Sequence, residues 1–320
     1  MLPLYDFVSA NKVFCNYFIT TPHADKDATA PFSAFLSFSS YLYQHAYRTS
    51  RSSTYAYLTL LIMLLLTEDS TPAKLLCETS SPVRLSQQRP PHMPAPKGPR
   101  PYACAILDIL TDGLNHNLRK RLDTAFYTQL LTVQTRLLAH LAKTRTKLTY
   151  HWSELWRSLL SFLRFLTTYP SDLKSLLRTP DILHALVNLL TLALTTGEAF
   201  LPDAAAYDDL FYKLVESGDA LVRLRDTFHL ATAEDKKAHI NTLVGVSEHY
   251  RELIESERAK KEHLSPKEVA GVIKRGYETL SLEEKEGLEG FERYREVEHK
   301  TALKRVARVV VADGGNWVLR

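Results

Sequence analysis

The chain has 320 residues, of which 45% are apolar and 24% are charged, so it can bury a continuous core and is not disordered throughout. Glycine is scarce, at 11 residues, and the turn-punctuated short strands of a β-sandwich or barrel are not evident, which indicates an all-α fold. The net charge of +4 and three widely spaced cysteines exclude a strongly charged chain, a disulfide framework and a CxxC metal or redox pair.

Helical spacing of apolar residues and recurrent capping signals predict twelve helices, with no β-ladder among them. Residues 1–79 are expected to form the N-terminal helices of a stacked array, residues 102–311 the main array, and residues 312–320 a tail. The expected helices span residues 5–20, 32–49, 52–68, 102–117, 123–144, 152–168, 171–178, 181–195, 205–230, 233–259, 266–279 and 282–311.

The first helices show no sign of a membrane span or an export signal. The N-terminus lacks the charged start and small-residue cleavage site of a secretory signal, which indicates a cytosolic protein. The most apolar run, from Tyr57 to Leu66, is ten residues long, about half of the roughly 20 that cross a bilayer as a helix. It therefore predicts a buried core helix.

A proline-rich segment follows at residues 80–101. It holds seven prolines and no aromatic residue, so it can neither continue a helix nor bury much surface. It is predicted to be a flexible basic loop, which makes the fold a helical array interrupted by one long connection.

Positive charge gathers in the middle of the chain. Residues 84–164 carry 13 basic against 4 acidic residues, whereas the flanking segments are close to neutral or slightly acidic. This asymmetry points to an anionic partner, either lipid head groups or an acidic peptide; nucleic acid is less favoured because aromatic residues are not interleaved with the charges. The alternative is that these cations only stabilise helix C-termini. The candidate contact residues are Arg119, Lys120, Arg121, Arg145 and Lys147.

The clearest amphipathic pattern in the chain covers residues 152–168, where large apolar residues recur on one side of the expected helix. The next long helix is apolar on nearly every side from Leu183 to Leu194, again too short for a membrane span. The candidate core residues on these two helices are Trp152, Trp156, Phe162, Leu186 and Leu190.

Catalytic motifs are missing. The phosphate-binding GxxxxGK[ST] loop, the GxGxxG turn, the HExxH zinc helix and the GxSxG elbow do not occur, and no two histidines have the spacing of a helical metal pair. Asp208 and Asp209 lie near an expected helix start, where carboxylates favour the helix dipole. We therefore expect no enzyme activity, no cofactor, no metal and no small-molecule substrate.

Four stretches resemble one family: RPYACAILDIL at 100–110, YHWSELWRSLLSFLRFL at 150–166, GEAFLPDAAAYDDLFYKL at 197–214 and YETLSLEEKEGLEGFERY at 277–294. Residues 35–69 extend the likeness in the same order. The chain resembles the C-terminal portion of the armadillo-like helical domain-containing protein 3 family, whose members extend further at the N-terminus. Residues 305–320 depart from the family pattern.

This resemblance implies an armadillo-like or HEAT-like α-solenoid in the cytosol that associates peripherally with Golgi membranes. It also implies a partnership with phosphatidylinositol 4-kinase beta, and so a role in phosphoinositide supply, Golgi organisation and secretion. The leading hypothesis is a non-enzymatic scaffold for a lipid kinase or trafficking regulator. The alternative is a peripheral membrane module that binds anionic lipids through its basic centre, and an unrecognised enzyme is a third reading.

Overall fold

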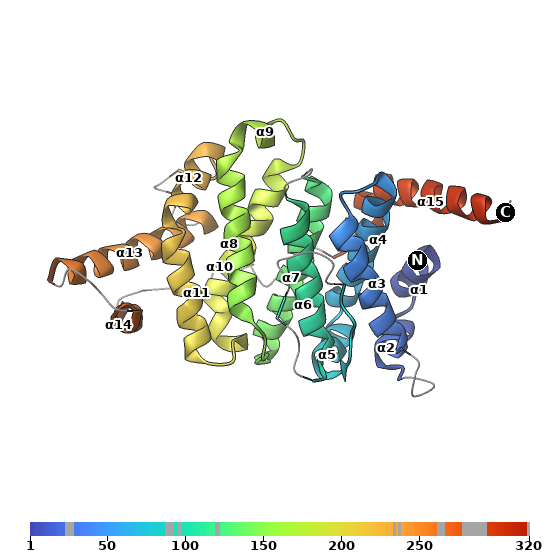
Figure 1. Ribbon diagram of the computed structural model, residues 1–320, viewed down its shortest axis with the longest axis horizontal. Coiled ribbons are helices and arrows are strands. Elements are labelled where there is room, and N and C mark those ends of the chain that lie inside the picture. The colour runs from blue at the N-terminus through green and yellow to red at the C-terminus, as the bar shows by residue number, and fades with distance from the viewer. Residues whose placement is uncertain are drawn as a thin grey trace. The chain divides into compact units, whose positions relative to one another are not determined.

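The computed structural model describes residues 1–22, 29–86, 93–94, 98–118, 122–232, 235, 238–260, 266–276 and 293–318. Within these residues the chain forms fifteen helices and one pair of very short strands, so the fold is all-α, as expected (Figure 1). It divides into two compact units, Met1–His140 with Gly290–Arg320 and Leu141–Glu289. We call them unit 1 and unit 2 and describe each by itself.

Unit 1 is built around α3 and α4. α3 packs against α6 and α4, and α4 also contacts α1 and α15. Because α4 is apolar around most of its circumference, its residues from Leu58 to Leu64 are almost completely buried. The helices of this unit are α1 (Leu2–Ala10), α2 (Lys12–Thr20), α3 (Pro31–His45), α4 (Ser50–Glu68), α5 (Ser70–Glu78), α6 (Tyr102–Asn117), most of α7 (Thr124–Thr144) and α15 (Glu296–Val318).

The single helix predicted over residues 5–20 is wrong, because the chain breaks at Asn11. Asn11 has an extended backbone, and its side-chain oxygen accepts a hydrogen bond from the backbone N–H of Phe14 at 3.0 Å. Asparagine is one of the best N-cap residues, so Asn11 ends α1 and starts α2. Apolar spacing alone gives no sign of this break.

The ends of the proline-rich segment pair with each other, so the prediction of no β-ladder is wrong at this point. Strand β1 (Ser80–Ser81) lies antiparallel to β2 (Arg100–Pro101). Beyond β1, the carbonyl of Ser86 accepts a hydrogen bond from Gln44 of α3 at 2.6 Å. Residues 87–92 and 95–97 lie outside the described residues, so flexibility of the segment remains a prediction.

The last helix differs from the one predicted over residues 282–311. Residues 277–292 lie outside the described residues, residues 293–295 are not helical, and α15 then runs to Val318. The predicted tail at 312–320 is therefore helical as far as Val318. Polar contacts join α15 to α4: the Tyr57 hydroxyl lies 2.9 Å from Nδ1 of His299, and Asp313 pairs with Arg51 at 2.6 Å.

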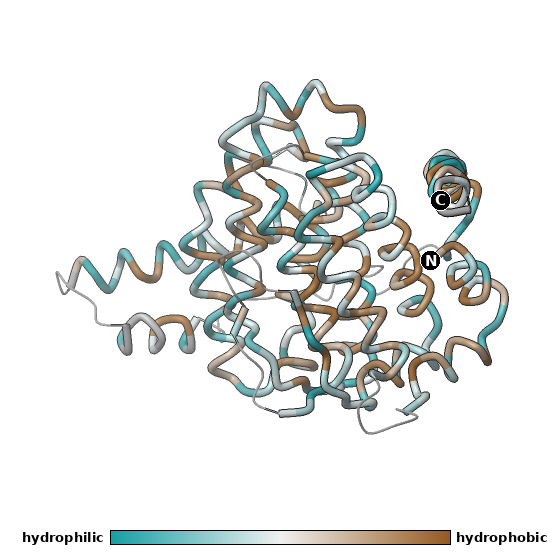
Figure 2. Tube along the Cα trace, turned by 45° about the vertical axis from the view of Figure 1, so that its right-hand side comes forward, coloured by the Kyte–Doolittle hydropathy of each residue, from teal (hydrophilic) through white to brown (hydrophobic). Residues whose placement is uncertain are grey.

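Unit 2 packs its helices around the large apolar side chains of α8. α8 contacts α11 and α12, while α13 contacts α10, α11 and α12. Figure 2 shows hydrophobic residues recurring along the packed helices, as burial of apolar surface requires. The helices of this unit are α8 (Trp152–Thr168), α9 (Pro170–Lys174), α10 (Thr179–Phe200), α11 (Ala204–Glu216), α12 (Gly218–Phe228), α13 (His239–Lys260) and α14 (Pro266–Gly276).

Residues 205–230 form two helices and not the single helix that was predicted. α11 ends before Ser217, and α12 begins at Gly218. A Cβ at Gly218 would collide with the Ser247 side chain of α13, so glycine is required for the close approach of these helices. The helix predicted over 171–178 is also shorter, because α9 ends at Lys174.

In the part of the chain that the structure describes, α10 alone has the length and hydropathy to cross a membrane. However, 61% of its most apolar window is buried inside the protein. This burial is what a core helix shows, so length and composition do not by themselves indicate a span.

Candidate functional site

The segment that joins α7 to α8 begins with an unusual backbone. Arg145 has a φ of 50°, in the left-handed region that glycine normally occupies after a helix. The N–H of Arg145 donates to the Ala142 carbonyl at 3.1 Å, and the N–H of Thr146 donates to the Leu141 carbonyl at 2.9 Å. These two bonds form the Schellman pattern, which satisfies the last carbonyls of α7.

Leu148 holds the rest of this segment against unit 2. Its side chain is buried, and its N–H donates to the Phe200 carbonyl at 3.0 Å. Its own carbonyl accepts a hydrogen bond from Nε1 of Trp152 at 2.9 Å. Residues 147–151 are not helical, as the gap between the helices predicted over 123–144 and 152–168 implies, and these bonds give the connector a defined path.

Three exposed cations lie close together in sequence here: Lys143 in the last turn of α7, and Arg145 and Lys147 in the connector. None has an ion-pair partner among the described residues, whereas exposed Arg157 of α8 pairs with Glu154. We call these three residues the α7–α8 basic cluster. Of the predicted contact residues, Arg145 and Lys147 therefore lie together, while Arg119, Lys120 and Arg121 lie outside the described residues.

The predicted core residues of α8 and α10 lie in the interior of unit 2, where each is no more than 2% exposed. The rings of Trp152 and Trp156 stack, with centroids 5.6 Å apart, and Trp152 also contacts Phe200. Nε1 of Trp156 is buried and has no hydrogen-bond partner in the described part of the chain. The core residues predicted from the sequence are Trp152, Trp156, Phe162, Leu186 and Leu190.

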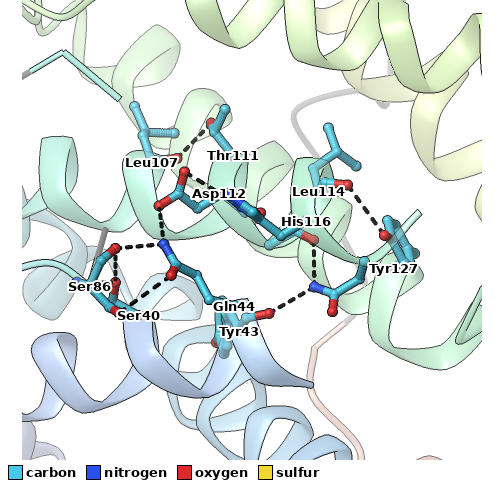
Figure 3. Close-up of polar contacts among 12 residues, drawn as sticks. Ser40, Tyr43, Gln44, Ser86, Leu107, Thr111, Asp112, Leu114, His116 and Tyr127 are labelled. Atoms are coloured by element: carbon cyan, nitrogen blue, oxygen red, sulfur yellow. Dashed lines mark hydrogen bonds and ion pairs between the residues drawn. The ribbon is translucent and has the colours of Figure 1, made fainter. Parts of the chain in front are cut away.

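Unit 1 contains a buried polar network between α3 and α6 that the apolar spacing does not reveal (Figure 3). Nε2 of Gln44 lies 2.6 Å from the Ser86 carbonyl and 3.4 Å from Oδ2 of Asp112. The N–H of Ser86 donates to Oγ of Ser40 at 2.8 Å, and Nδ2 of Asn117 donates to the Tyr43 carbonyl at 2.8 Å. The polar residues recurring within residues 37–45 were the one available signal.

Burial raises the pKa of Asp112 to about 7; its hydrogen bond from Gln44 acts in the opposite direction, and the charge of Asp108 adds to the rise. Asp108 itself pairs with Arg100, and Nδ1 of His116 donates to the backbone carbonyl of Asp112 at 2.9 Å. The Asp112 side chain is only 4% exposed. A carboxyl so enclosed can hold a proton near neutral pH, but it offers no open face to a substrate.

Other groups of chemical interest are also enclosed. Burial raises the pKa of Cys77 and of Cys104 to about 12, so neither thiol is a reactive thiolate at neutral pH. No group of three histidine, cysteine, aspartate or glutamate side chains within the described ranges could hold a metal ion.

One cavity of about 280 Å³ lies where α9, α10 and α12 end or begin, slightly below the roughly 300–1,000 Å³ of usual ligand pockets. Lys174, His184 and His229 line it together with leucines and Phe228. No carboxylate is among the described residues that line it, so it lacks an acid–base pair of carboxyl groups.

Comparison with known proteins places these features in a family. Residues 100–315 match the model of the C-terminal region of armadillo-like helical domain-containing protein 3. Residues 305–315, for which the sequence predicts a departure from the family pattern, lie inside this match, as does most of α15. No solved structure matches the chain.

Individual relatives give the same result. The human armadillo-like helical domain-containing protein 3 is 30% identical over 214 residues, which is 63% of this chain and 31% of the human protein. A Schizosaccharomyces pombe protein named as a membrane protein is 26% identical over 311 residues, which is 95% of this chain and 49% of that protein. The chain thus spans about a third to a half of the length of these curated relatives. With more than half of its residues matched by the family model, the chain belongs to the armadillo-like helical domain-containing protein 3 family.

Proposed function

We propose that this chain is a non-catalytic helical scaffold that docks a lipid kinase resembling phosphatidylinositol 4-kinase beta at Golgi membranes. In this role it supports phosphoinositide supply, Golgi organisation and secretion. The protein is cytosolic in this proposal and associates peripherally with the membrane.

The proposal rests on one contrast: the carboxyl and thiol groups with raised pKa values are buried, whereas a cluster of cations is exposed. Burial raises the pKa values of Asp112, Cys77 and Cys104, and all three residues lie buried among packed helices. The α7–α8 basic cluster, by contrast, is exposed, and none of its cations pairs with an acidic side chain within the described ranges. Binding energy is therefore available on outer surfaces, where a macromolecule can reach it, which favours docking over catalysis.

The packing order supports an armadillo-like array as the finer description of the fold. In unit 2, α10 contacts α11, α11 contacts α12, and α12 contacts α13. Stacking of consecutive helices is how α-solenoids extend their cores and present long binding surfaces. A stable interface of standard size needs on the order of 800 Å² per partner, which such a surface can supply.

The test compares the basic residues with the kinase. One arm replaces Arg119, Lys120, Arg121, Arg145 and Lys147 by glutamine in the tagged chain, and the other depletes the kinase; both score Golgi association. We expect kinase depletion to lower Golgi association far more than the glutamine substitutions do, because exposed basic residues each contribute only about 1 kcal/mol at an anionic surface.

A matched control removes the same number of charges from residues that are already paired with acidic side chains. These are Lys74, Arg157, Arg178, Arg251 and Arg275. Undiminished Golgi association after kinase depletion would overturn the kinase-docking proposal.

The second candidate function is a peripheral membrane module that binds anionic lipids through the basic centre. The observation that favours it is the exposed, unpaired α7–α8 basic cluster, since a positive patch next to a membrane attracts anionic head groups. It takes precedence if the five-residue glutamine variant leaves the Golgi while its matched control and the kinase-depleted cells do not change.

A further inference from the structure

The outer face of α15 carries the second group of unpaired cations in the described chain. Lys300, Lys304, Arg305 and Arg308 are all exposed, and none has an ion-pair partner among the described residues. Residues 299–312 contain no acidic residue at all. We call these four residues the α15 basic face.

The spacing of these residues places them together. Lys300, Lys304 and Arg308 follow one another at intervals of four, so they lie along one side of the helix, and Arg305 lies beside them. They lie within the nine residues 300–308, whose ends are eight steps or about 12 Å apart along the helix axis. Val311, which is 75% exposed, continues the same side at the next turn.

The opposite face of α15 is fixed to unit 1, so the basic face cannot turn inward without breaking contacts. Val306 is 1% exposed and His299 is 7% exposed. His299 meets the Tyr57 hydroxyl at 2.9 Å, and Asp313 accepts a hydrogen bond from the Tyr55 hydroxyl at 2.9 Å. Figure 1 shows α15 beside α4 at the edge of unit 1.

We propose that the α15 basic face binds the surface of a bilayer that contains anionic phospholipids. Four unpaired positive charges on one side of a helix complement a plane of negative head groups, and long lysine and arginine side chains can reach such a plane together. Exposed Val311 adds an apolar contact at the head-group boundary. A small anion would need converging donors, and the outer side of a single helix is convex.

This surface is distinct from the α7–α8 basic cluster of unit 2, and the inference does not depend on a kinase partner. It predicts that the chain binds vesicles without any other protein. The measurement is co-sedimentation of the purified full chain with phosphatidylcholine vesicles, with and without phosphatidylserine. We expect binding to the anionic vesicles only, and binding that falls as salt is added, because screening weakens exposed charges.

The decisive variant replaces Lys300, Lys304, Arg305 and Arg308 by glutamine. At about 1 kcal/mol for each charge near the surface, affinity for anionic vesicles should fall roughly fivefold per residue and by several hundredfold, or about 600-fold, for all four. The matched control replaces four exposed basic residues that are paired with acidic side chains and should lose far less. These control residues are Lys74, Arg157, Arg178 and Arg251.

Three outcomes would overturn the proposal. The first is equal binding of the α15 variant and the wild type to anionic vesicles. The second is loss of vesicle binding on replacing Lys143, Arg145 and Lys147 while the α15 variant still binds. The third is binding of the α15 basic face to a glutamate-rich peptide with no vesicle binding, which would make the partner an acidic protein segment.

A fluorescent label tests the orientation directly. All three native cysteines are buried, so a thiol-reactive, environment-sensitive dye can be placed by Val311→Cys, with Val13→Cys of α2 as a control of the same 75% exposure. The dye at position 311 should change its emission on anionic vesicles, and the dye at position 13 should not. The reverse pattern would show that another face meets the membrane.

Discussion

The interface between α3 and α6 in unit 1 and the core around α8 in unit 2 are equally enclosed, but they differ in chemistry. The first contains Gln44, Asp112 and Asn117, each 3% exposed or less. The second is built from Trp152, Trp156 and their apolar neighbours. Apolar interfaces are stabilised by buried area alone, whereas a polar interface needs each group to find a partner.

This difference predicts which kind of change destabilises each unit most. Unit 2 should be destabilised most by substitutions that remove side-chain volume, because each cavity left in a close-packed core lowers the free energy of unfolding. Unit 1 should be sensitive to protonation and to loss of single hydrogen bonds, because its enclosed polar groups depend on one another.

Trp156→Ala should lower the free energy of unfolding by roughly 3–5 kcal/mol, because it empties a large site that is completely buried. Denaturant unfolding measures the loss. Trp156→Phe is the control: it keeps a ring and removes an indole N–H that has no partner in the described chain, so it should cost less than half as much. A change of only a few tenths of a kcal/mol for the alanine variant would mean that Trp156 lies on a surface.

Asp112 should make unit 1 less stable as the pH rises. Its pKa is about 7 in the folded protein against 3.8 ordinarily, so the folded state binds more protons between about pH 4 and pH 7. The free energy of unfolding attributable to this group should therefore fall across that window by on the order of 2–4 kcal/mol and then stay level. Unfolding measured at several pH values gives the slope.

Asp112→Asn is the control for that slope. It removes the titration while keeping an oxygen for Gln44, so the variant should gain stability relative to the wild type between pH 4 and pH 7. Asp108, Arg100 and His116 remain in both proteins and cancel from the difference. Equal pH profiles for the two proteins would contradict the raised pKa.

Tyr57→Phe should cost about 1 kcal/mol, the usual net value of one hydrogen bond, because it removes the bond to His299. Since His299 belongs to α15, amide hydrogen exchange along α15 should quicken more than exchange in α3. Tyr17→Phe serves as a control: Tyr17 is 67% exposed, so this substitution should leave the free energy of unfolding nearly unchanged. Unchanged exchange in α15 would show that other contacts hold this helix.

Arg145→Gly should raise the free energy of unfolding by about 0.5–1 kcal/mol, because glycine occupies a positive φ without strain. Arg145→Gln removes the same charge but keeps the strain, so its stability should stay within about 0.5 kcal/mol of the wild type. Thermal melts of the two variants separate the effect of relieving backbone strain from the effect of removing the positive charge. A glycine variant that melts lower than the glutamine variant would contradict the strain argument.

Much of unit 2 can be predicted from residue spacing. Apolar residues at intervals of three and four over residues 152–166 predict which side of α8 is buried, because helical geometry brings such residues together. The same spacing misses the breaks at Asn11 and Ser217. These breaks depend on a cap and on the approach of α13 to Gly218, and neither changes the apolar period.

The candidate surfaces were only partly predictable. Charge counting identified Arg145 and Lys147 but not the α15 basic face, because residues 165–320 as a whole are slightly acidic. A cation becomes available to a partner only when no acidic side chain pairs with it. That property depends on the folded neighbourhood, as the contrast between Arg157 and Lys147 shows.

The sequence by itself determined that this chain is all-α, that α8 buries its tryptophans, and to which family the chain belongs, since each rests on local spacing or on residue order. Only the tertiary structure decided that Asp112 is enclosed with Gln44 and that α15 turns its cations outward. Both depend on partners far apart in the chain: Gln44 and Asp112 are 68 residues apart, and Tyr57 and His299 are 242 residues apart. Spacing along one helix shows which face is apolar, but it does not show which distant side chain meets a polar group.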